Sequence, residues 1–380
     1  MLKVAIVGCG KIADAHASQI QRIAGCEIVA ACDREELMAR QLAERFQIPR
    51  SFNDLTTLIS ESQPDVVHIA TSPESHFSLA KQCLESGCHV YVEKPFTLNR
   101  READTLVTLA ERSRLKITAG HDDQFRPGAR RLRQMVRDGF LGSAPLHMES
   151  YYGYELDHTG AYARALLGDK NHWVRRLPGQ LLHNIISHGI ARIAEYMVGP
   201  TPTVIAHGFV SPTLRRMGET DIVDELRVIV SDESGATAYF TFSSHMRPSL
   251  HQFRIFGTRN GLQLDQDNET LVRLPGKRYK SYAEHFLSPI VMAKEYLGNA
   301  TRNMRAFAAS EFHMKAGLKC LTESFYRSIT HDAPLPIPYR EIVLTAQIMD
   351  DIFTQIRRPA AVSSLERDDA AAGAVVSSST

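Results

Sequence analysis

Short apolar runs alternate with longer amphipathic segments over the first 120 residues. The apolar runs predict strands at residues 3–7, 27–32, 66–70, 89–92 and 116–119. Between them, apolar residues at three- and four-residue spacing predict helices at residues 12–24, 35–46, 75–86 and 100–112. Because strands and helices alternate, this part should be an α/β domain whose parallel sheet is covered by helices on both faces.

The pattern changes after Gly120. Helical periodicity appears at residues 129–138, 311–328 and 342–356, and strand-like runs lie at 146–152, 203–210, 225–230 and 236–243. Strands that follow one another without crossover helices pair antiparallel, so we expect an α+β domain with a mainly antiparallel sheet. The predicted division is 1–121, 122–358 and a tail, 359–380, whose lack of large apolar residues predicts disorder.

The composition is that of a folded protein that acts on small molecules. The 380 residues suggest two domains, and 44 Lys+Arg against 43 Asp+Glu leave a net charge of +1. Such a chain has no overall field to attract nucleic acid or an anionic membrane, so we expect neither as a partner. The arginines of residues 126–137 are typical of a solvated helix face.

The cysteines and the N-terminus indicate a cytoplasmic protein. The six cysteines form no CxxC pair and no usual zinc spacing, so we expect reduced thiols in the core. The chain enters its first strand without the charged and apolar regions of a signal peptide, and no apolar run is long enough to span a membrane.

A glycine-rich loop follows the first predicted strand. Gly8, Gly10 and Ala13 fit the pattern GxGxxA at the start of a helix. Gly8 permits the tight turn, Gly10 lets a pyrophosphate approach the backbone, and Ala13 lets helix and strand pack closely. The helix N-terminus, at Lys11 and Ile12, would offer N–H groups to the phosphates. The first domain is therefore predicted to be a Rossmann dinucleotide-binding domain.

An acid stands at the end of the next strand. Asp33 lies 20 residues beyond Ala13, where a carboxylate accepts hydrogen bonds from the ribose hydroxyls of NAD. Arg34 would suit the 2′-phosphate of NADP, but the Asp33 charge would repel that phosphate, so NAD is favoured. Asp33 as a plain helix cap is the alternative.

Six segments together resemble the glucose-fructose oxidoreductase / inositol dehydrogenase / MocA (Gfo/Idh/MocA) family of oxidoreductases. They are GCGKIA (8–13), Asp33, IATSPESH (69–76), VEKP (92–95), GHDDQFRPGARRLRQMVRDGFLG (120–142) and LPGQLLHNIISHGIARIAEYMVG (177–199). The resemblance implies a Rossmann domain, a second domain with an open-faced sheet, an active site between them, and often an oligomer built on that sheet. It also implies cofactor contacts from Thr71, Ser72, Pro73, His76, Glu93 and Lys94.

The resemblance assigns the chemistry to Lys94 and to a histidine helix. Lys94 would stabilise the substrate oxygen as hydride leaves the carbon. The family carries an aspartate four residues before the catalytic histidine, whereas this chain has Asn184 before His188. On one helix the two side chains would share a face. An amide cannot stabilise an imidazolium by charge, so His188 should hold a proton less readily, unless another group such as His183 assists.

Substrate contacts are expected from both sides of the cleft. The expected residues are His121, Asp123, Tyr152, Trp173 and His183. Gln124 replaces an arginine frequent in the family, so no role is carried to it. Aromatic and polar side chains between Tyr151 and Arg175, His158 among them, suit a polyol. A metal site from His121, Asp122, Asp123, His183 and His188 is considered and not expected, because no HExxH-like pattern is present.

The sequence thus predicts an NAD(P)-dependent oxidoreductase that transfers hydride between the nicotinamide and a secondary hydroxyl or ketone of a sugar, cyclitol or sugar derivative. Lys94, His188 and Asn184 are the predicted catalytic residues. Two alternatives stay open. The same fold could use transient oxidation by bound NAD for elimination, epimerisation or glycoside cleavage, or the chain could be a non-catalytic NAD(H)-binding regulator.

Overall fold

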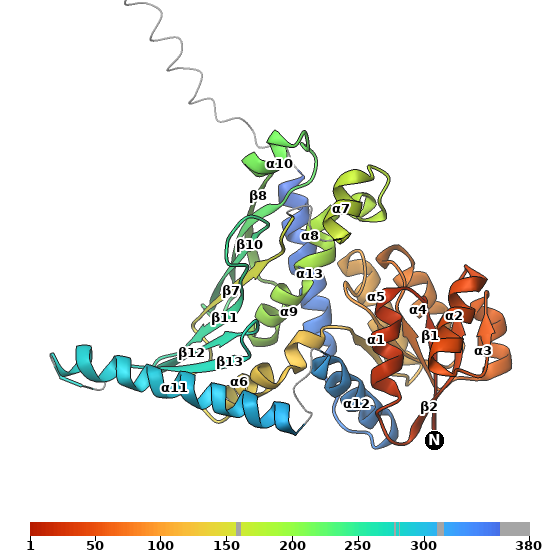
Figure 1. Ribbon diagram of the computed structural model, residues 1–380, viewed down its shortest axis with the longest axis horizontal. Helices are drawn as coiled ribbons and strands as arrows, with labels where there is room; N and C mark the ends of the chain where they lie inside the picture. Colours follow the sequence, from red (N-terminus) through yellow and green to blue (C-terminus); the bar gives the residue numbers. More distant parts are fainter. Residues whose placement is uncertain (157–160, 277–278, 281, 310–314, 358–380) are drawn as a thin grey trace, which may run out of the picture.

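The computed structural model describes residues 1–156, 161–276, 279–280, 282–309 and 315–357. Two sheets form two domains that lie side by side (Figure 1). His158 and the predicted tail at 359–380 fall outside the described residues.

The first sheet has six parallel strands in the order β3-β2-β1-β4-β5-β6. Its strands are β1 (Leu2–Val7), β2 (Cys26–Cys32), β3 (Ser51–Phe52), β4 (Val66–Ile69), β5 (His89–Val92) and β6 (Ile117–Ala119). Its helices are α1 (Lys11–Ile20), α2 (Glu36–Phe46), α3 (Leu55–Ser62), η1 (Pro73–Ser75), α4 (His76–Glu85) and α5 (Arg100–Arg112). The predicted α/β order is confirmed, with β3 and α3 as additions. β3 is two residues long, too short to show a strand period.

The second sheet has seven strands in the order β13-β12-β11-β7-β10-β9-β8. They are β7 (His147–Gly153), β8 (Thr203–Phe209), β9 (Glu225–Ser231), β10 (Thr237–Ser243), β11 (His251–Phe256), β12 (Asn260–Asp265) and β13 (Thr270–Pro275). The pair β7–β10 is parallel and the other five pairs are antiparallel. The predicted mainly antiparallel domain is therefore confirmed.

Helices cover one face of this sheet. The helices that follow β6 in sequence are η2 (Asp122–Phe125), α6 (Pro127–Arg137), α7 (Ala161–Gly168), η3 (Trp173–Arg176), α8 (Gln180–Ile185), α9 (Ser187–Tyr196), α10 (Pro212–Arg216), α11 (Ala283–Ala308), α12 (Ala316–Thr330) and α13 (Tyr339–Ile356). Helix α9 packs on β7 and β10, and α13 packs on α9 and β8. On the other face Ile205, Ile229 and Tyr239 are exposed, so the sheet is open there.

The C-terminal helices tie the two domains together. Leu318 and Phe325 of α12 belong to the core of the first domain, although they follow the second sheet in sequence. Helix α13 runs between the domains (Figure 1) and gives Ile342 to the first core and Phe353 to the second. The two domains are therefore joined by buried apolar contacts.

The cysteines are all free, as predicted, and four of the six are buried. In the part of the chain that the structure describes, no helix combines the length and apolar character needed to cross a membrane.

Candidate active site

The glycine loop between β1 and α1 has the backbone that its sequence requires. Gly8 has φ +89°, and a Cβ there would lie 2.6 Å from the Cγ2 of Thr71. Only glycine fits this position without displacing its neighbours. A Cβ at Gly10 would meet no atom within 4 Å, so this residue leaves room for a ligand above the start of α1.

Asp33 fastens this loop from the end of β2. One carboxylate oxygen accepts a hydrogen bond from the Cys9 N–H at 2.7 Å, and the other accepts from the Glu35 N–H at 3.0 Å. Each oxygen has a second lone pair for a ribose hydroxyl. The carboxylate therefore fixes the loop and also borders the groove in which a nucleotide would lie.

A groove of about 740 Å³ runs along the carboxyl ends of these strands. It is lined by Val7, Gly8, Gly10, Cys32, Asp33, Arg34, Asn53, Asp54, Leu55, Ala70, Thr71, Ser72, Glu74, Ser75, Ser78, Leu79, Gln82 and Arg176. Arg176, from the second domain, pairs with Glu74 at 3.2 Å and so bridges the rim. This groove fits a dinucleotide, because it has glycines at a helix start, an acid at the ribose position and polar residues along its wall.

Several predicted cofactor residues lie beneath the groove. His76 is fully buried and its ring bonds the Pro95 carbonyl at 2.9 Å and the Thr71 carbonyl at 3.1 Å. Both ring nitrogens of His76 are thus used within the protein, and its direct contact with the cofactor stays a prediction. Ala13 and Pro73 are buried as well. These residues shape the loops that line the groove.

Lys94 stands where β5 turns into the cleft. The Lys94–Pro95 peptide bond is cis. The ammonium group is half-buried and donates to the main-chain carbonyl of Asn184, at 3.2 Å. This contact places Lys94 beside the helices of the second domain that carry His188.

A buried chain of hydrogen bonds supports the residue before Lys94. Glu93 bonds Nε2 of His16 at 2.9 Å, Nδ1 of His16 lies 3.0 Å from Nδ1 of His68, and Nε2 of His68 lies 2.9 Å from the Tyr326 hydroxyl. Although burial alone would raise it, the pKa of Glu93 falls to about 2, chiefly through the bond to His16. Glu93 is thus a fixed anion that anchors the Lys94 turn from inside the domain.

His188 faces a carboxylate of η2, the short helix that follows β6. Its Nδ1 lies 3.7 Å from an Asp123 carboxylate oxygen, with the side chains 11% and 19% exposed. That buried Nδ1 has no hydrogen-bond partner among the described residues. The Tyr152 ring stacks on the His188 ring at 6.2 Å, and its hydroxyl donates to Asp123 at 3.5 Å. Asp123, His188 and Tyr152 therefore form one cluster.

Burial keeps the histidines of this cluster neutral. It lowers the pKa of His188 to about 4, although Asp123 opposes the shift, and it lowers the pKa of His121 to about 3. Burial alone would raise the pKa of Asp123, but His188 and then Arg192 hold it below its usual range. At neutral pH the cluster therefore pairs an uncharged imidazole with a carboxylate, which is the state that a general base needs.

Asn184 does not contact His188 as the sequence suggested. Two helices, α8 and α9, meet at Ile186 in place of the single predicted helix. The Asn184 side chain donates a hydrogen bond to the Tyr162 hydroxyl at 2.9 Å, and the Asn184 main-chain carbonyl accepts a hydrogen bond from the Lys94 ammonium group. Of the two roles expected for Asn184, orienting the substrate or orienting His188, the structure does not favour the second, because Asp123 approaches His188 instead; the role toward the substrate stays a prediction.

His183 packs away from this cluster. It is 1% exposed, its ring stacks on Phe353 at 4.8 Å, and its Nε2 lies 3.4 Å from the Thr97 carbonyl. The structure therefore does not bring His183 to the cluster, because α8 turns its ring into the contact with α13, and its substrate contact stays a prediction. Trp173 lies at the outer end of an aromatic row that runs through His172 and Tyr162 to Asn184.

Two residues near the cluster escaped the sequence analysis. Arg192, one turn beyond His188, is 5% exposed and donates to the Asp123 carbonyl at 3.1 Å. Tyr162 receives the Asn184 amide. Arg192 follows His188 by four residues on α9, so helical spacing was the available signal. Tyr162 had no such signal, because only the fold brings it to α8.

Asp122 adds a second carboxylate. Ligand atoms of Asp122, Asp123 and His188 all lie within 4.8 Å of one another. Burial raises the pKa of Asp122 to about 7, and the neighbouring Asp123 adds to the rise. The spacing of these three side chains does not exclude a cation, so the expectation of a metal-free site stays a prediction.

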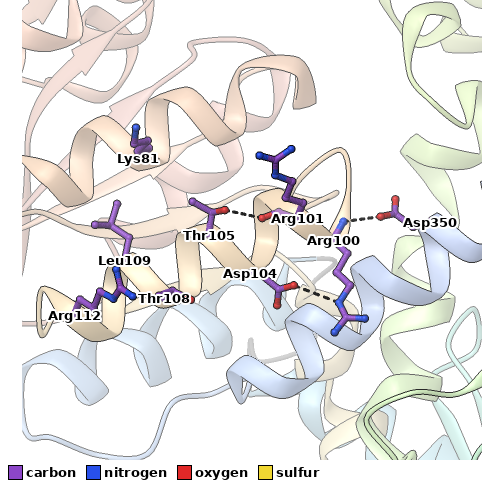
Figure 2. Close-up of a pocket in the computed structure, with 9 residues that line it drawn as sticks. All are labelled: Lys81, Arg100, Arg101, Asp104, Thr105, Thr108, Leu109, Arg112 and Asp350. Atoms are coloured by element: carbon purple, nitrogen blue, oxygen red, sulfur yellow. Dashed lines mark hydrogen bonds and ion pairs between the residues drawn. The ribbon is translucent and has the colours of Figure 1, made fainter.

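A second hollow, of about 690 Å³, lies between α4, α5 and α13 (Figure 2). Arg100 pairs with Asp104 at 3.3 Å, its main-chain N–H donates to Asp350 at 2.7 Å, and Lys81 lies 3.6 Å from Glu85. Its lining includes neither Lys94 nor His188. This hollow is therefore separate from the candidate active site, which comprises the nucleotide groove and the cluster around Lys94 and His188.

Comparison with known proteins agrees with this geometry. The profile described as the oxidoreductase family with an NAD-binding Rossmann fold matches residues 2–121, and the GFO/IDH/MocA C-terminal domain profile matches residues 129–263. The UDP-N-acetylglucosamine 3-dehydrogenase structure from Acidithiobacillus ferrooxidans has a TM-score of 0.69 and 20% identity, covering 93% of this chain and 97% of that chain. At that identity the likeness concerns the fold.

Two curated relatives are similar in sequence. The D-apiose dehydrogenase of Paraburkholderia graminis is 31% identical over 141 residues, which is 37% of this chain and 38% of that protein. The match thus spans less than half of that relative's length. The myo-inositol 2-dehydrogenase of Thermotoga maritima is 23% identical over 296 residues, 75% of this chain and 83% of that protein. With both of its domains matched, the chain belongs to the Gfo/Idh/MocA oxidoreductase family, and its first domain is of the NAD-binding Rossmann type.

Proposed function

We propose that this protein is an NAD-dependent oxidoreductase that acts on a secondary hydroxyl, or the matching ketone, of a sugar, cyclitol or sugar derivative. One observation carries the proposal: the Lys94 charge is near enough to His188 to lower its pKa, His188 faces Asp123, and the sheet that carries Lys94 borders a groove that fits a dinucleotide. Hydride removal from an alcohol requires two groups: a cation that stabilises the charge on the substrate oxygen, and a neutral base that accepts the hydroxyl proton.

Each residue then has a defined task. Bound NAD supplies the nicotinamide that accepts the hydride. Lys94 hydrogen-bonds the substrate oxygen and stabilises the charge that develops as the C–H bond breaks. Nδ1 of His188 faces Asp123, so Nε2 is left to take the hydroxyl proton as the C=O bond forms. Asp123 is a positioning residue, because its charge stabilises the imidazolium that results. In the opposite direction His188 returns the proton.

Asn184 holds the lysine and the cleft wall together. Its carbonyl orients Lys94, and its amide fixes Tyr162 at the start of the aromatic row. Such rings stack on the C–H faces of sugars, and this supports a polyol substrate. The relatives named above are dehydrogenases of sugars, a cyclitol and a nucleotide sugar. These residues support the same class of substrate for this chain.

Three finer assignments belong to the same proposal. NAD is favoured over NADP because Asp33 borders the ribose end of the groove. The open face of the second sheet, with Ile229 and Tyr239 exposed, would join copies into an oligomer. Six free thiols support a reducing compartment such as the cytoplasm.

The test is a polyol, cyclitol and nucleotide-sugar panel with NAD, read at the absorbance of reduced nicotinamide. We expect one substrate class to give turnover, and Lys94→Ala and His188→Ala each to lower kcat by about 100-fold or more. Lys116→Ala is a matched control, because that lysine is engaged with Ser328 and Asp332 outside the cleft. Full turnover by Lys94→Ala would refute the assignment.

Transient oxidation is the second candidate, and the absence of an acid at Asn184 is what favours it. That chemistry would form product from a retained cofactor without net accumulation of reduced nicotinamide. Binding of NAD without conversion across the panel would instead favour a regulator.

A further inference from the structure

The long helix α11 exposes an unusual number of large apolar side chains. Phe286 is 71% exposed, Leu297 67%, Met304 64% and Phe307 74%. Solvated helices of a single folded chain keep such residues on the covered face, and a contiguous apolar surface marks an interaction site. The family profile for the second domain ends at residue 263, before this helix begins.

These side chains follow a heptad repeat. Ile290, Leu297 and Met304 are seven residues apart, and so are the members of a second row, residues 286, 293, 300 and 307. The two rows alternate at spacings of three and four, as the a and d positions of a coiled coil do. All seven positions are exposed, and none carries a charge. We call these seven residues the α11 seam.

The opposite side of α11 is fixed to the second domain, so the seam cannot turn inward. Asn299 is fully buried and bonds both the N–H and the carbonyl of Leu271 in β13, at 3.1 Å and 2.9 Å. Arg273 of β13 donates to Glu295 at 2.8 Å. Figure 1 shows α11 lying along β13 and extending beyond the edge of the sheet. The seam therefore faces outward on a rigid support.

The geometry points to a second copy of this chain as the partner, and we propose that two α11 seams pair antiparallel about a two-fold axis. A two-fold pairing lets one surface serve both partners. In the antiparallel register Leu297 lies opposite Ala293 of the other copy and Ile290 opposite its Ala300, so large and small residues interlock in the middle of the seam. Phe286 meets Met304 of the other copy farther out. A parallel pairing would place alanine on alanine and leave gaps.

The area suffices for a specific interface. Five members of the α11 seam are large, and Leu287 and Tyr296 lie at its margins. These seven large apolar side chains have exposed fractions from 39% to 74%. At roughly 100 Å² for each complete side chain, two facing seams bury on the order of 1,000 Å². Specific interfaces need about that much. This contact is separate from the open sheet face and does not depend on the proposed activity.

The oligomeric state of the full chain tests the proposal. Light scattering after gel filtration, over a range of about 1 to 100 µM, should show a dimer or a higher even state. Leu297→Glu should halve the mass or raise the dissociation constant at least tenfold. Leu37→Glu is the matched control, because Leu37 is also exposed, at 54%, but lies on α2. A monomeric parent chain, or an unchanged mass for Leu297→Glu, would overturn the proposal. Binding of lipid vesicles by a monomeric parent chain would likewise overturn it, because the seam would then have a membrane as its partner.

Cross-linking tests the antiparallel arrangement. Lys294 lies near the middle of the seam and Ala308 at its end. At 1.5 Å per residue, the two Ala308 positions of an antiparallel pair stand roughly 40 Å apart. Lys294→Cys should therefore form an oxidative dimer, and Ala308→Cys should not, relative to the parent chain with its six native cysteines. Equal cross-linking at both positions, or none at either, would contradict the antiparallel pairing.

Discussion

Replacing Asp123 by asparagine removes the charge that faces the proposed base and leaves the shape of the side chain almost unchanged. The imidazolium formed on His188 during alcohol oxidation would stand 3.7 Å from this carboxylate. Two unit charges at that distance attract by about 1 kcal/mol in water and about 4.5 kcal/mol at an effective dielectric constant of about 20. The pair is largely buried, so we take about 3 kcal/mol, which is roughly 100-fold in rate.

Asp123→Asn should therefore lower kcat about 100-fold at pH 7 with the substrate found in the panel. The carboxylate opposes the fall in the pKa of His188, so its loss should also move the acid limb of the kcat/KM profile to lower pH. If Asp123 had only a structural role, its replacement would lower kcat without moving the acid limb of the kcat/KM profile. Steady-state kinetics from pH 4 to 9 measure both quantities.

The neighbouring carboxylate and Asn184 provide the controls. Asp122 has a pKa raised to about 7 and is therefore mostly uncharged below pH 6, so Asp122→Asn should change kcat there by less than about fivefold. The exchange Asp123→Asn with Asn184→Asp places the acid on a side chain that faces Tyr162, so it should not recover the lost rate. If Asp123→Asn kept its rate within threefold, or if the acid limb stayed in place, the pairing of Asp123 with His188 would be refuted.

Three further predictions follow from the cleft. Gly8→Ala forces a side chain into a backbone with φ +89° and against Thr71, so the affinity for NAD, measured by calorimetry, should fall at least about tenfold. Gly87 has a similar φ but open space around it, so Gly87→Ala should leave the affinity unchanged. His188 has a pKa of about 4 and must be neutral to accept a proton, so kcat/KM for oxidation should be lost only as the pH falls toward 4, and an acid limb near pH 6.5 would contradict this. Removal of divalent cations with a chelator should leave turnover unchanged, and a loss restored by added magnesium or zinc would show that Asp122, Asp123 and His188 hold a metal.

The sequence could predict the parts of the site that lie within a few residues of a regular element. The glycine loop, Asp33 and Lys94 each follow a strand, and strand ends meet at one edge of a parallel sheet. The partner of His188 could not be predicted in the same way. Asp123 lies 65 residues before His188, and only the packing of η2 against α9 brings the two together. His183 and Asn184 were misplaced because the expected single helix is divided at Ile186.

The elements beyond residue 243 show a second limit. Strands β11 to β13 and helix α11 were not predicted. The apolar residues of α11 lie on its exposed side, and Pro289 and Gly298 interrupt the helical pattern. Amphipathic patterns identify a helix most readily when its apolar stripe faces the core of its own chain.

Deuterium transfer tests the central claim most directly. Once the panel has given a substrate, the reacting carbon is labelled with deuterium and the cofactor is analysed by mass spectrometry after turnover. Direct hydride transfer predicts deuterium in the reduced nicotinamide, together with a slower reaction for the labelled substrate, and His188→Ala should lower the amount formed. Product formation with no deuterium in the cofactor pool would contradict the account of this cleft as a dehydrogenase site.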